Sequence, residues 1–280
     1  MQEKWQCRWS PTLGALEEGH QDIWGTDDYT DIERPTVFFG VYGLPDFYTL
    51  WRHKGKKAIL WAGTDIQHFR KGYWLEDNEN GLKITSMPLA KWMDKHCDNW
   101  CENEVEAKAL KLLGINSKVC PSFLGHVDKF EVCYKQSIRP KVYASVSGDN
   151  FYQYGWMDIE LIAPQHPDVE FHLYGNKGLW SSKHSNVIVH GRVPKEQMNE
   201  EIKGMQGALR LLKFDGASEI IVKAMLMGQY VYSYIPYVGV NELKDLNLLK
   251  YMKVPNKDKK WWLDNLNQFP WNIYSKHTKH

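Results

Sequence analysis

Apolar runs and amphipathic segments alternate through the second half of the chain. Strands are predicted where β-branched and aromatic residues gather and a glycine or polar residue follows, over Lys141–Ser147, Val169–Tyr174, Asn186–His190, Ala208–Leu212 and Tyr230–Tyr234. Apolar residues at helical spacing predict helices between these strands, over Tyr154–Pro164, Pro194–Lys203 and Ser218–Met227. This order predicts right-handed crossovers and a parallel sheet that helices cover on both faces.

The first half shows the same alternation with less regular spacing. It predicts strands over Thr36–Tyr42, Lys57–Trp61 and Lys118–Cys120, and helices over Asp46–Lys54 and Asn103–Leu113. The second helix is amphipathic, and Gly114 follows it as a suitable C-terminal stop. Residues 1–35 have little periodicity and predict mostly loop, with Lys4–Trp9 as a remnant of a first strand. The chain is therefore predicted to form two αβ halves.

The composition is that of a globular protein and narrows the range of functions. Of 280 residues, 43% are hydrophobic and 25% are charged, and the net charge of +1 provides no overall field for binding DNA or anionic lipid. No apolar run reaches the ~18 residues of a membrane-spanning helix. The N-terminal residues also lack the apolar stretch of a signal peptide. We therefore expect no transmembrane segment and a cytoplasmic protein.

The cysteines do not predict a metal site. Five cysteines are scattered along the chain, which fits reduced thiols. Cys97 and Cys101 stand four residues apart, but a zinc site needs two further ligands at matched spacing. Cys120 and Cys133 do not supply a second tight pair.

The stretch from Ala208 to Tyr234 carries the most chemical information. A predicted strand ends near Leu212, a short loop follows, and Ser218 is a natural N-cap for the next helix. Ligands of open parallel sheets bind at the carboxyl ends of the strands, and the N–H groups of a helix N-terminus attract phosphate. The loop is therefore suited to hold a diphosphate, although an ordinary strand-to-helix turn explains the same pattern.

This stretch resembles the donor-binding signature of GT-B glycosyltransferases related to family 4. In that signature an acid opens a loop, a helix ends in Glu-Ala-Met or similar, and a glycine precedes the next strand. Here Asp215–Ser218 matches the loop, and Ala224–Met225 and Gly228 match the helix end. Weaker similarity extends over residues 36–240 and includes Trp61–Asp65, which resembles a strand-end loop facing the cleft between the domains.

One position departs from the family pattern. The family has a second acid eight residues after the first, which usually binds the ribose. In this chain the first acid falls on Asp215 and the second position falls on Lys223. Another residue must then contact the ribose, or the donor is altered.

The resemblance implies an α/β fold of two Rossmann-like domains that face each other across a cleft, with a shortened N-terminal half. Residues 1–135 are expected to form the acceptor-side domain, and residues 136–243 the domain that binds the nucleotide sugar. Residues 244–280, which are basic and aromatic, are expected to form a helical tail that packs back on the body.

The expected site centres on the loop before the helix at Ser218. Asp215 is expected to contact hydroxyls of the donor sugar. The backbone amides of Gly216, Ala217 and Ser218 are expected to bind the phosphates. Arg210 and Lys213 are expected to supply positive charge.

Three further residues are candidates. Glu219 is expected to contact the nucleoside or its ribose in place of the missing acid. Asp65 is a candidate catalytic residue that orients or deprotonates the acceptor hydroxyl, and a strand-end cap explains it equally well. His190 ends a strand beside Gly191 and is a weaker candidate.

The implied reaction is transfer of a hexosyl or pentosyl group from a nucleotide sugar, expected to be a UDP-sugar, to an acceptor hydroxyl. The resemblance implies retention of the anomeric configuration. No two aspartates stand two residues apart, so an Asp-x-Asp metal motif is absent and no essential metal or other cofactor is expected. The acceptor stays open among a glycan, a lipid-linked sugar, a protein and modified DNA.

Three alternatives stay open at this point. A tryptophan-rich first half and a basic, aromatic tail suit a viral enzyme that glycosylates hydroxymethylated DNA bases in the host cytoplasm. Lys223 in place of an acid suits a non-catalytic protein that binds nucleotide sugars. A sugar-nucleotide epimerase of the GT-B type is a further alternative. Turnover distinguishes a transferase from the non-catalytic protein, because a binding protein releases no nucleotide.

Overall fold

The computed structural model of the chain describes residues 3–16, 19–74, 85–146, 151–175 and 181–274. These residues form two compact units, which we describe separately. Unit 1 consists of Met1–His126, Phe214–Ala217 and Asn265–His280, and unit 2 consists of Val127–Lys213 and Ser218–Asp264. The segment Phe214–Ala217 thus clusters with unit 1 although both of its sequence neighbours belong to unit 2.

Unit 1 is built on a parallel sheet of six strands in the order β2-β1-β3-β4-β5-β6. The strands are β1 (Gln6–Trp9), β2 (Asp27–Asp28), β3 (Thr36–Phe39), β4 (Lys57–Leu60), β5 (Asp98–Cys101) and β6 (Lys118–Val119). β3 and nearly all of β4 are buried, as expected for central strands covered on both faces.

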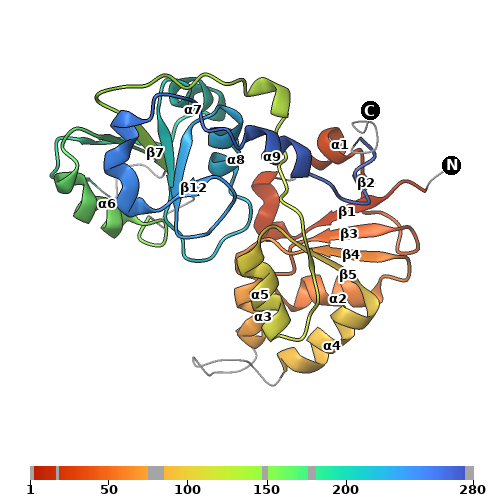
Figure 1. Ribbon diagram of the computed structural model, residues 1–280. Coiled ribbons are helices and arrows are strands. Elements are labelled where there is room, and N and C mark those ends of the chain that lie inside the picture. Colours follow the sequence, from red (N-terminus) through yellow and green to blue (C-terminus); the bar gives the residue numbers. More distant parts are fainter. Residues whose placement is uncertain (1–2, 17–18, 75–84, 147–150, 176–180, 275–280) are drawn as a thin grey trace. The chain divides into compact units, whose positions relative to one another are not determined.

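Helices cover both faces of this sheet (Figure 1). One face carries α2 (Leu44–Arg52), α3 (Thr64–Arg70), α4 (Ser86–His96) and α5 (Glu104–Leu112). The other face carries α1 (Gly19–Trp24) and residues 265–274, which contribute Phe269 and Trp271 to an aromatic core. Short 3-10 turns at Pro11–Leu16 and Gly72–Trp74 complete the connections.

Unit 2 contains a second parallel six-stranded sheet, in the order β12-β11-β10-β7-β8-β9. Its strands are β7 (Lys141–Ser145), β8 (Glu170–Tyr174), β9 (Val187–Gly191), β10 (Gly207–Arg210), β11 (Tyr230–Ser233) and β12 (Val240–Asn241). The central position of β10 brings the end of this strand to the middle of the carboxyl edge.

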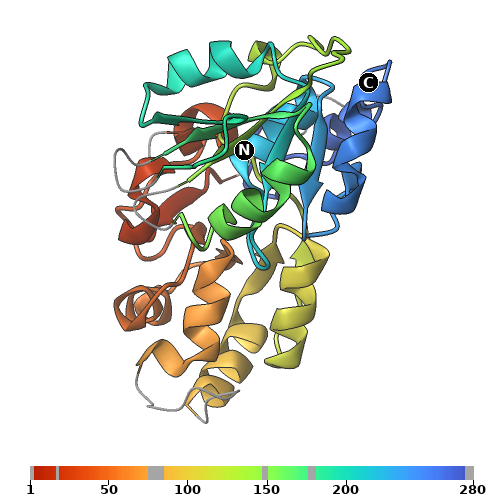
Figure 2. The ribbon, with the colours of Figure 1, turned by 90° about the vertical axis from the view of Figure 1, so that its left-hand side faces the viewer.

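The helices of unit 2 also lie on both faces of its sheet (Figure 2). α6 (Trp156–Ile162) and the 3-10 helix Leu243–Tyr251 pack on one face. The other face carries α7 (Lys195–Ile202), joined to the sheet by a hydrogen bond from the Tyr174 hydroxyl to Glu201, and α8 (Glu219–Leu226). α9 (Lys259–Asn265) follows, and short 3-10 turns lie at Val127–Lys129 and Ala163–Gln165.

The structure confirms the α/β class, the two Rossmann-like units and each strand named in the sequence analysis. The remnant expected at Lys4–Trp9 is a full strand, β1, which pairs with both β2 and β3. Hydrophobic periodicity missed α3, α4 and β5. β5 (DNWC) carries polar residues that the sequence pattern does not mark as strand, because Asn99 is buried by bonding to the Trp61 indole and to backbone carbonyls.

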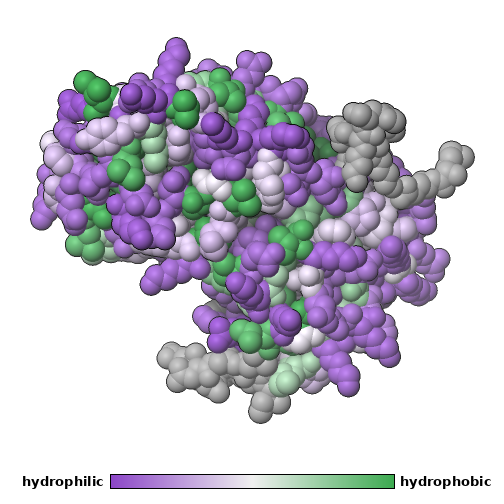
Figure 3. All heavy atoms as spheres, viewed as in Figure 1, coloured by the Kyte–Doolittle hydropathy of each residue, from purple (hydrophilic) through white to green (hydrophobic). Residues whose placement is uncertain are grey.

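On the face of the molecule seen in Figure 3, hydrophobic side chains are scattered among hydrophilic ones. Exposed apolar residues that occur singly are normal on a globular surface. Within the described ranges, the structure has no helix that is both long and apolar enough to span a membrane.

Asn267 is predicted to fasten the C-terminal segment to unit 1. Its side chain accepts from the Trp24 indole (3.1 Å) and the Phe123 N–H (3.0 Å) and donates to the Phe123 carbonyl oxygen (2.7 Å). Asn267→Ala leaves these buried groups without partners, so we expect the free energy of unfolding to fall by roughly 2–4 kcal/mol. Denaturant titration measures this loss, with the exposed Gln268→Ala as control. Equal stability of the two variants would contradict this role.

Candidate functional site

Arg210 ends β10 at the carboxyl edge of the sheet in unit 2. Its guanidinium lies 4.5 Å from the centroid of the Tyr154 ring and donates to the Ser145 carbonyl oxygen (3.4 Å). Lys213 follows three residues later and is exposed. Two cations therefore lie along the short path between β10 and α8, the path that the sequence assigns to phosphate.

α8 begins as the sequence predicts, with Ser218 at the N-cap. The Ser218 side chain makes no capping hydrogen bond. The Ile221 N–H donates to the Ser218 carbonyl oxygen (3.0 Å), so in the first turn the N–H groups of Glu219 and Ile220 have no acceptor within the helix, and the helix dipole adds a partial positive charge there. An anion at this position is therefore favoured.

Glu219, in the first turn of α8, is paired with two lysines. One carboxylate oxygen lies 3.0 Å from Lys223 Nζ and the other 3.4 Å from Lys195 Nζ. Burial alone would raise the pKa of Glu219, but the two ammonium groups outweigh it and hold the pKa below its usual value. Glu219 is thus an ionised, oriented acceptor whose side chain keeps 30% of its surface exposed.

Lys223, which stands at the position of the family's second acid, points into unit 2. It is 5% exposed, and its ammonium lies 5.9 Å from the centroid of the Phe130 ring. Its ion pair with Glu219 offsets the cost of burying the charge.

Residues 214–217, called here the 214–217 loop, are held by unit 1. The Ala217 N–H donates to Glu102 Oε2 (2.7 Å), and Asn103 Nδ2 donates to the Asp215 carbonyl oxygen (2.7 Å). The Phe214 side chain packs against the core beneath α3 and α5. Asp215 itself is half-buried. Glu102 and Asn103, directly after β5, therefore set the backbone that carries Asp215.

Two glycines make this contact possible. Gly63 has a φ of +81°, and a side chain there would bring its Cβ within 2.9 Å of the Gly216 nitrogen. A Cβ on Gly216 would overlap the Glu102 carboxylate. Gly216 is one of the residues expected to bind phosphate, and its lack of a side chain is also needed for the approach to Glu102.

Glu102 and Glu106 form a buried pair of acids next to the 214–217 loop. Glu102 accepts a further hydrogen bond from the Ser122 hydroxyl, and Glu106 Oε2 accepts from the Glu102 N–H (2.6 Å). Burial raises the pKa of Glu102 to about 8, and burial together with the Glu102 charge raises that of Glu106 well above its usual value. Glu106 Oε1 is buried without a hydrogen-bond partner. The pair therefore retains protons at neutral pH.

Asp65 is fully buried at the start of α3. Its carboxylate accepts from the N–H groups of Val41 (3.0 Å), Ala62 (3.0 Å) and Ile66 (2.8 Å). Burial raises its pKa to about 7 although these three bonds oppose the shift. In this structure Asp65 ties the turns after β3 and β4 together, which matches the strand-end cap weighed in the sequence analysis.

His190 lies in β9 beside His172 of β8. His172 Nδ1 and His190 Nε2 are 2.9 Å apart, and the His190 ring stacks on Tyr174 with centroids 4.4 Å apart. Burial lowers the pKa of His172. His190 is thus engaged with neighbouring strand side chains.

The structure thus keeps Arg210, Lys213, Ser218 and Glu219 in unit 2, whereas Asp215, Gly216 and Ala217 cluster with Asp65 in unit 1. Sequence reasoning missed Glu102, Asn103 and Lys195. A signal for Asn103 was present: Asn103 with Glu106 three residues later has the spacing of a helix start with a capping acid, and the Asn103 side chain indeed caps α5.

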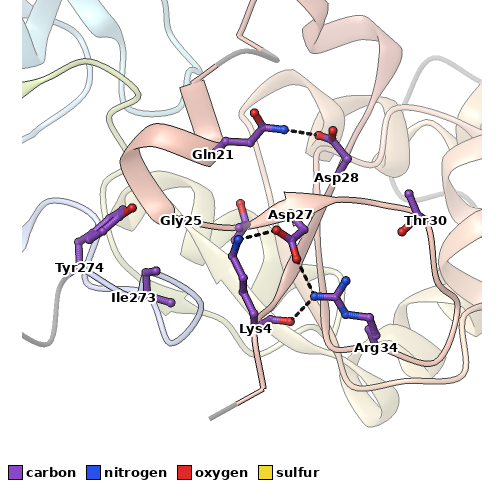
Figure 4. Close-up of a pocket in the computed structure, with 10 residues that line it drawn as sticks. Lys4, Gln21, Gly25, Asp27, Asp28, Thr30, Arg34, Ile273 and Tyr274 are labelled. Carbon is purple, nitrogen blue, oxygen red and sulfur yellow. Dashed lines mark hydrogen bonds and ion pairs between the residues drawn. The ribbon is translucent and has the colours of Figure 1, made fainter. Parts of the chain in front are cut away.

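A cavity of about 520 Å³ opens near the amino ends of β1 and β2 (Figure 4). Its two cations, Lys4 and Arg34, are both already engaged in ion pairs with Asp27. Elsewhere too, no group of three or more His, Cys, Asp or Glu side chains is arranged to hold a metal ion in the part of the chain that the structure describes.

No family profile and no curated protein sequence matches the chain. Solved structures match its fold. TarM aligns at a TM-score of 0.52 with 13% identity, covering 89% of this chain and 49% of TarM. Sucrose-phosphate synthase from Thermosynechococcus elongatus aligns at 0.50 with 10% identity, covering 71% and 55%. Both are GT-B glycosyltransferases.

This chain has the GT-B fold. It spans about half the length of these two structures. At such low identity the likeness establishes the fold alone.

The buried acids predict how stability depends on pH. The Glu106 carboxyl has an ordinary pKa of 4.5, and the folded protein keeps it protonated to higher pH. The folded state therefore binds more protons above that value, and the free energy of unfolding falls as the pH rises from about 5 to about 8.5. Glu106→Gln removes the contribution of Glu106 to this dependence and leaves those of Glu102 and Asp65, so we expect it to be more stable than wild type by roughly 1–3 kcal/mol at high pH.

Denaturant titration at pH 5 and pH 8.5 measures this effect. The matched control is Glu104→Gln, because Glu104 is exposed on the same helix. A stability difference between wild type and Glu106→Gln that is the same at both pH values would show that Glu106 does not titrate as described.

Proposed function

We propose that the protein is a glycosyltransferase that moves a sugar from a nucleotide-sugar donor to an acceptor hydroxyl. The GT-B fold supports this reaction, and the observation that carries it is the strand-to-helix path from Arg210 to Glu219. Cations, a helix N-terminus and an oriented carboxylate occur together there at the carboxyl end of the central strand β10. This combination suits a diphosphate joined to a ribose.

Each residue of this path has a proposed role. The first-turn amides of α8 bind the diphosphate, with Arg210 and Lys213 neutralising its charge. Glu219, held by Lys195 and Lys223, accepts hydrogen bonds from the ribose hydroxyls in place of the acid that this chain lacks.

The 214–217 loop supplies a second part of the proposal. Asp215 accepts hydrogen bonds from the donor sugar hydroxyls. The Ala217 amide already donates to Glu102, so it holds the loop in place and is not available to the phosphate while this bond is made. Asp65 is proposed to hold the turns after β3 and β4 in place, and His190 has no role in the proposed reaction.

The donor is proposed to be a UDP-sugar. A structure of a mutant form of S. aureus TarM, described in complex with fondaparinux, alpha-GlcNAc-glycerol and UDP, aligns at a TM-score of 0.51 with 12% identity. The covered shares are 89% of this chain and 50% of that one. The named ligands are a nucleotide and carbohydrates, so a glycan acceptor is favoured over modified DNA.

In the proposed reaction the bond between the anomeric carbon and the diphosphate breaks, and UDP leaves with the bonding electron pair. The acceptor oxygen forms the new bond, and its proton passes to a phosphate oxygen of the departing UDP. Arg210, Lys213 and the α8 amides stabilise the charge that develops on the leaving diphosphate. Retention of configuration, independence from metal and transfer of a hexosyl or pentosyl group belong to this proposal.

Nucleotide release with a panel of UDP-, GDP-, ADP- and dTDP-sugars tests the function. We expect one donor to raise the melting temperature and to release nucleotide in wild type. Asp215→Asn should reduce kcat by about ten-fold or more, because it keeps the side-chain shape but replaces a charged acceptor. Asp168→Asn, at an exposed acid of unit 2, is the control. The proposal fails if none of the donors binds wild type.

Lys213 is expected to act by charge on the donor diphosphate. Lys213→Gln should raise the donor KM by about three- to ten-fold with a smaller change in kcat, because Lys213 is exposed and its contribution is screened. The effect should shrink at high salt. Steady-state kinetics at two ionic strengths measures it, and Lys253→Gln, another exposed lysine, is the charge-matched control. Identical donor KM values in both variants would remove Lys213 from the site.

A further inference from the structure

Glu102 is the acid on which the 214–217 loop depends most directly. Both of its carboxyl oxygens are engaged, Oε2 by the Ala217 N–H and Oε1 by the Ser122 hydroxyl. Asn103, the other residue that holds the loop, has its side-chain oxygen committed to capping α5 through the N–H groups of Val105 and Glu106. Of the two residues that hold the loop, only Glu102 can ionise.

The loop lies against Glu102 with no intervening side chain. Gly216 has no Cβ, and a Cβ there would overlap the Glu102 carboxylate and approach Glu106 Oε1 to 3.7 Å. Glu102 is 6% exposed and Glu106 is fully buried. Ionisation of Glu102 would thus place a negative charge in a poorly solvated position directly behind the loop backbone.

The Ala217 N–H is the group that links Glu102 to donor binding. A protonated carboxyl accepts this N–H through its carbonyl oxygen and donates through its hydroxyl, so the loop can be held without a net charge. An ionised carboxyl keeps the bond to Ala217 but adds a negative charge behind the loop that carries Asp215, and the proposed donor is itself an anion. Donor affinity should therefore fall when Glu102 loses its proton.

The ionisable groups around Glu102 are mainly acids. They include Glu106 of α5, Asp65 of α3, Asp215 of the loop, the Cys101 and Cys120 thiols and the Tyr42 hydroxyl. Burial and the negative charges of Asp215 and Asp65 keep the proton on Glu102 until the pH nears 8, with its pKa raised to about 8. The transition therefore lies within reach of an activity assay.

We propose that Glu102 is a positioning residue of the donor site, which holds the Ala217 N–H and thereby the Asp215 side chain, and whose ionisation opposes binding of an anionic donor. This inference rests on the proposed function. It extends that function in two ways. It names a residue that directly follows β5 as part of the donor site, and it gives a pH range in which donor binding weakens.

The test uses the full chain and three variants, with the donor selected by the nucleotide-sugar panel. Glu102→Gln keeps an acceptor for Ala217 and a donor for Ser122 but cannot ionise. Glu102→Ala removes the hold on the loop. Glu104→Ala, at the exposed neighbouring acid, is the control. Hydrogen exchange of the peptide spanning 214–217 is measured beside the kinetics, because it reports on the loop without needing activity.

At pH 7 we expect Glu102→Ala to exchange the 214–217 amides about ten-fold faster and to lose about ten-fold or more in kcat/KM. Glu102→Gln should stay within about three-fold of wild type in both measurements. Between pH 7 and pH 9 the donor KM should rise in wild type and stay flat in Glu102→Gln.

A fourth variant checks the assignment if Glu102→Ala does not fold. The Ser122 hydroxyl stabilises the ionised form of Glu102, so Ser122→Ala should move the rise in donor KM to higher pH. A rise that stays in place, or one that persists in Glu102→Gln, belongs to another group and overturns the inference.

The remaining outcomes separate this inference from the proposed function. If wild type turns over a donor and Glu102→Ala equals it in kinetics or in loop exchange, the role of Glu102 is overturned and the proposed function stands. Wild type that turns over no nucleotide sugar overturns the proposed function, and the positioning role with it.

Discussion

The hydrogen bonds from Glu102 and Asn103 to the 214–217 loop are the constraint on which the candidate site depends. They fix one backbone N–H and one carbonyl group on either side of Gly216. Because the path between β10 and α8 is short, fixing its middle also restricts where Asp215 can lie. The geometry of the proposed donor contacts therefore depends on residues that are over one hundred positions away in the sequence.

The α8 end of this path and its middle, the 214–217 loop, differ in electrostatic character. At the α8 end, lysines hold an ionised Glu219 and lower its pKa against the effect of burial. At the loop, the buried acids Glu102 and Glu106 have raised pKa values, because burial disfavours their charged forms. Glu219 is thus an ionised acceptor of hydrogen bonds, whereas Glu102 keeps its proton and holds the loop.

Periodicity was sufficient to predict most of the fold, because central parallel strands are apolar on both faces and read as continuous runs. β1 and β5 are exceptions of different kinds. β1 was read as a remnant because polar Gln6 and Arg8 interrupt it, and Gln6 is buried by bonding to the backbone at Thr30 and Asp31. Periodicity alone does not mark β5, because its buried Asn99 is polar and is satisfied by the Trp61 indole and by the carbonyl groups of Met93 and Cys97.

The candidate site was predictable only in part, for a related reason. The motif-like spacing around Asp215 and Ser218 is local and can be read from the chain. The hold of Glu102 on Ala217, and the pairing of Lys195 with Glu219, join segments that no local pattern connects. Asp65 was selected as an acid at a strand end, but its three backbone partners become visible only when the turns after β3 and β4 are placed together.

A crystal structure of the protein with bound UDP tests the central claim most directly. The account predicts the diphosphate at the first turn of α8, within hydrogen-bonding distance of Arg210 or Lys213, and ribose hydroxyls on Glu219. UDP bound elsewhere, for example in the cavity beside Asp27, or no bound UDP at saturating concentration, would contradict the claim that the segment from Arg210 to Glu219 is a nucleotide-sugar site.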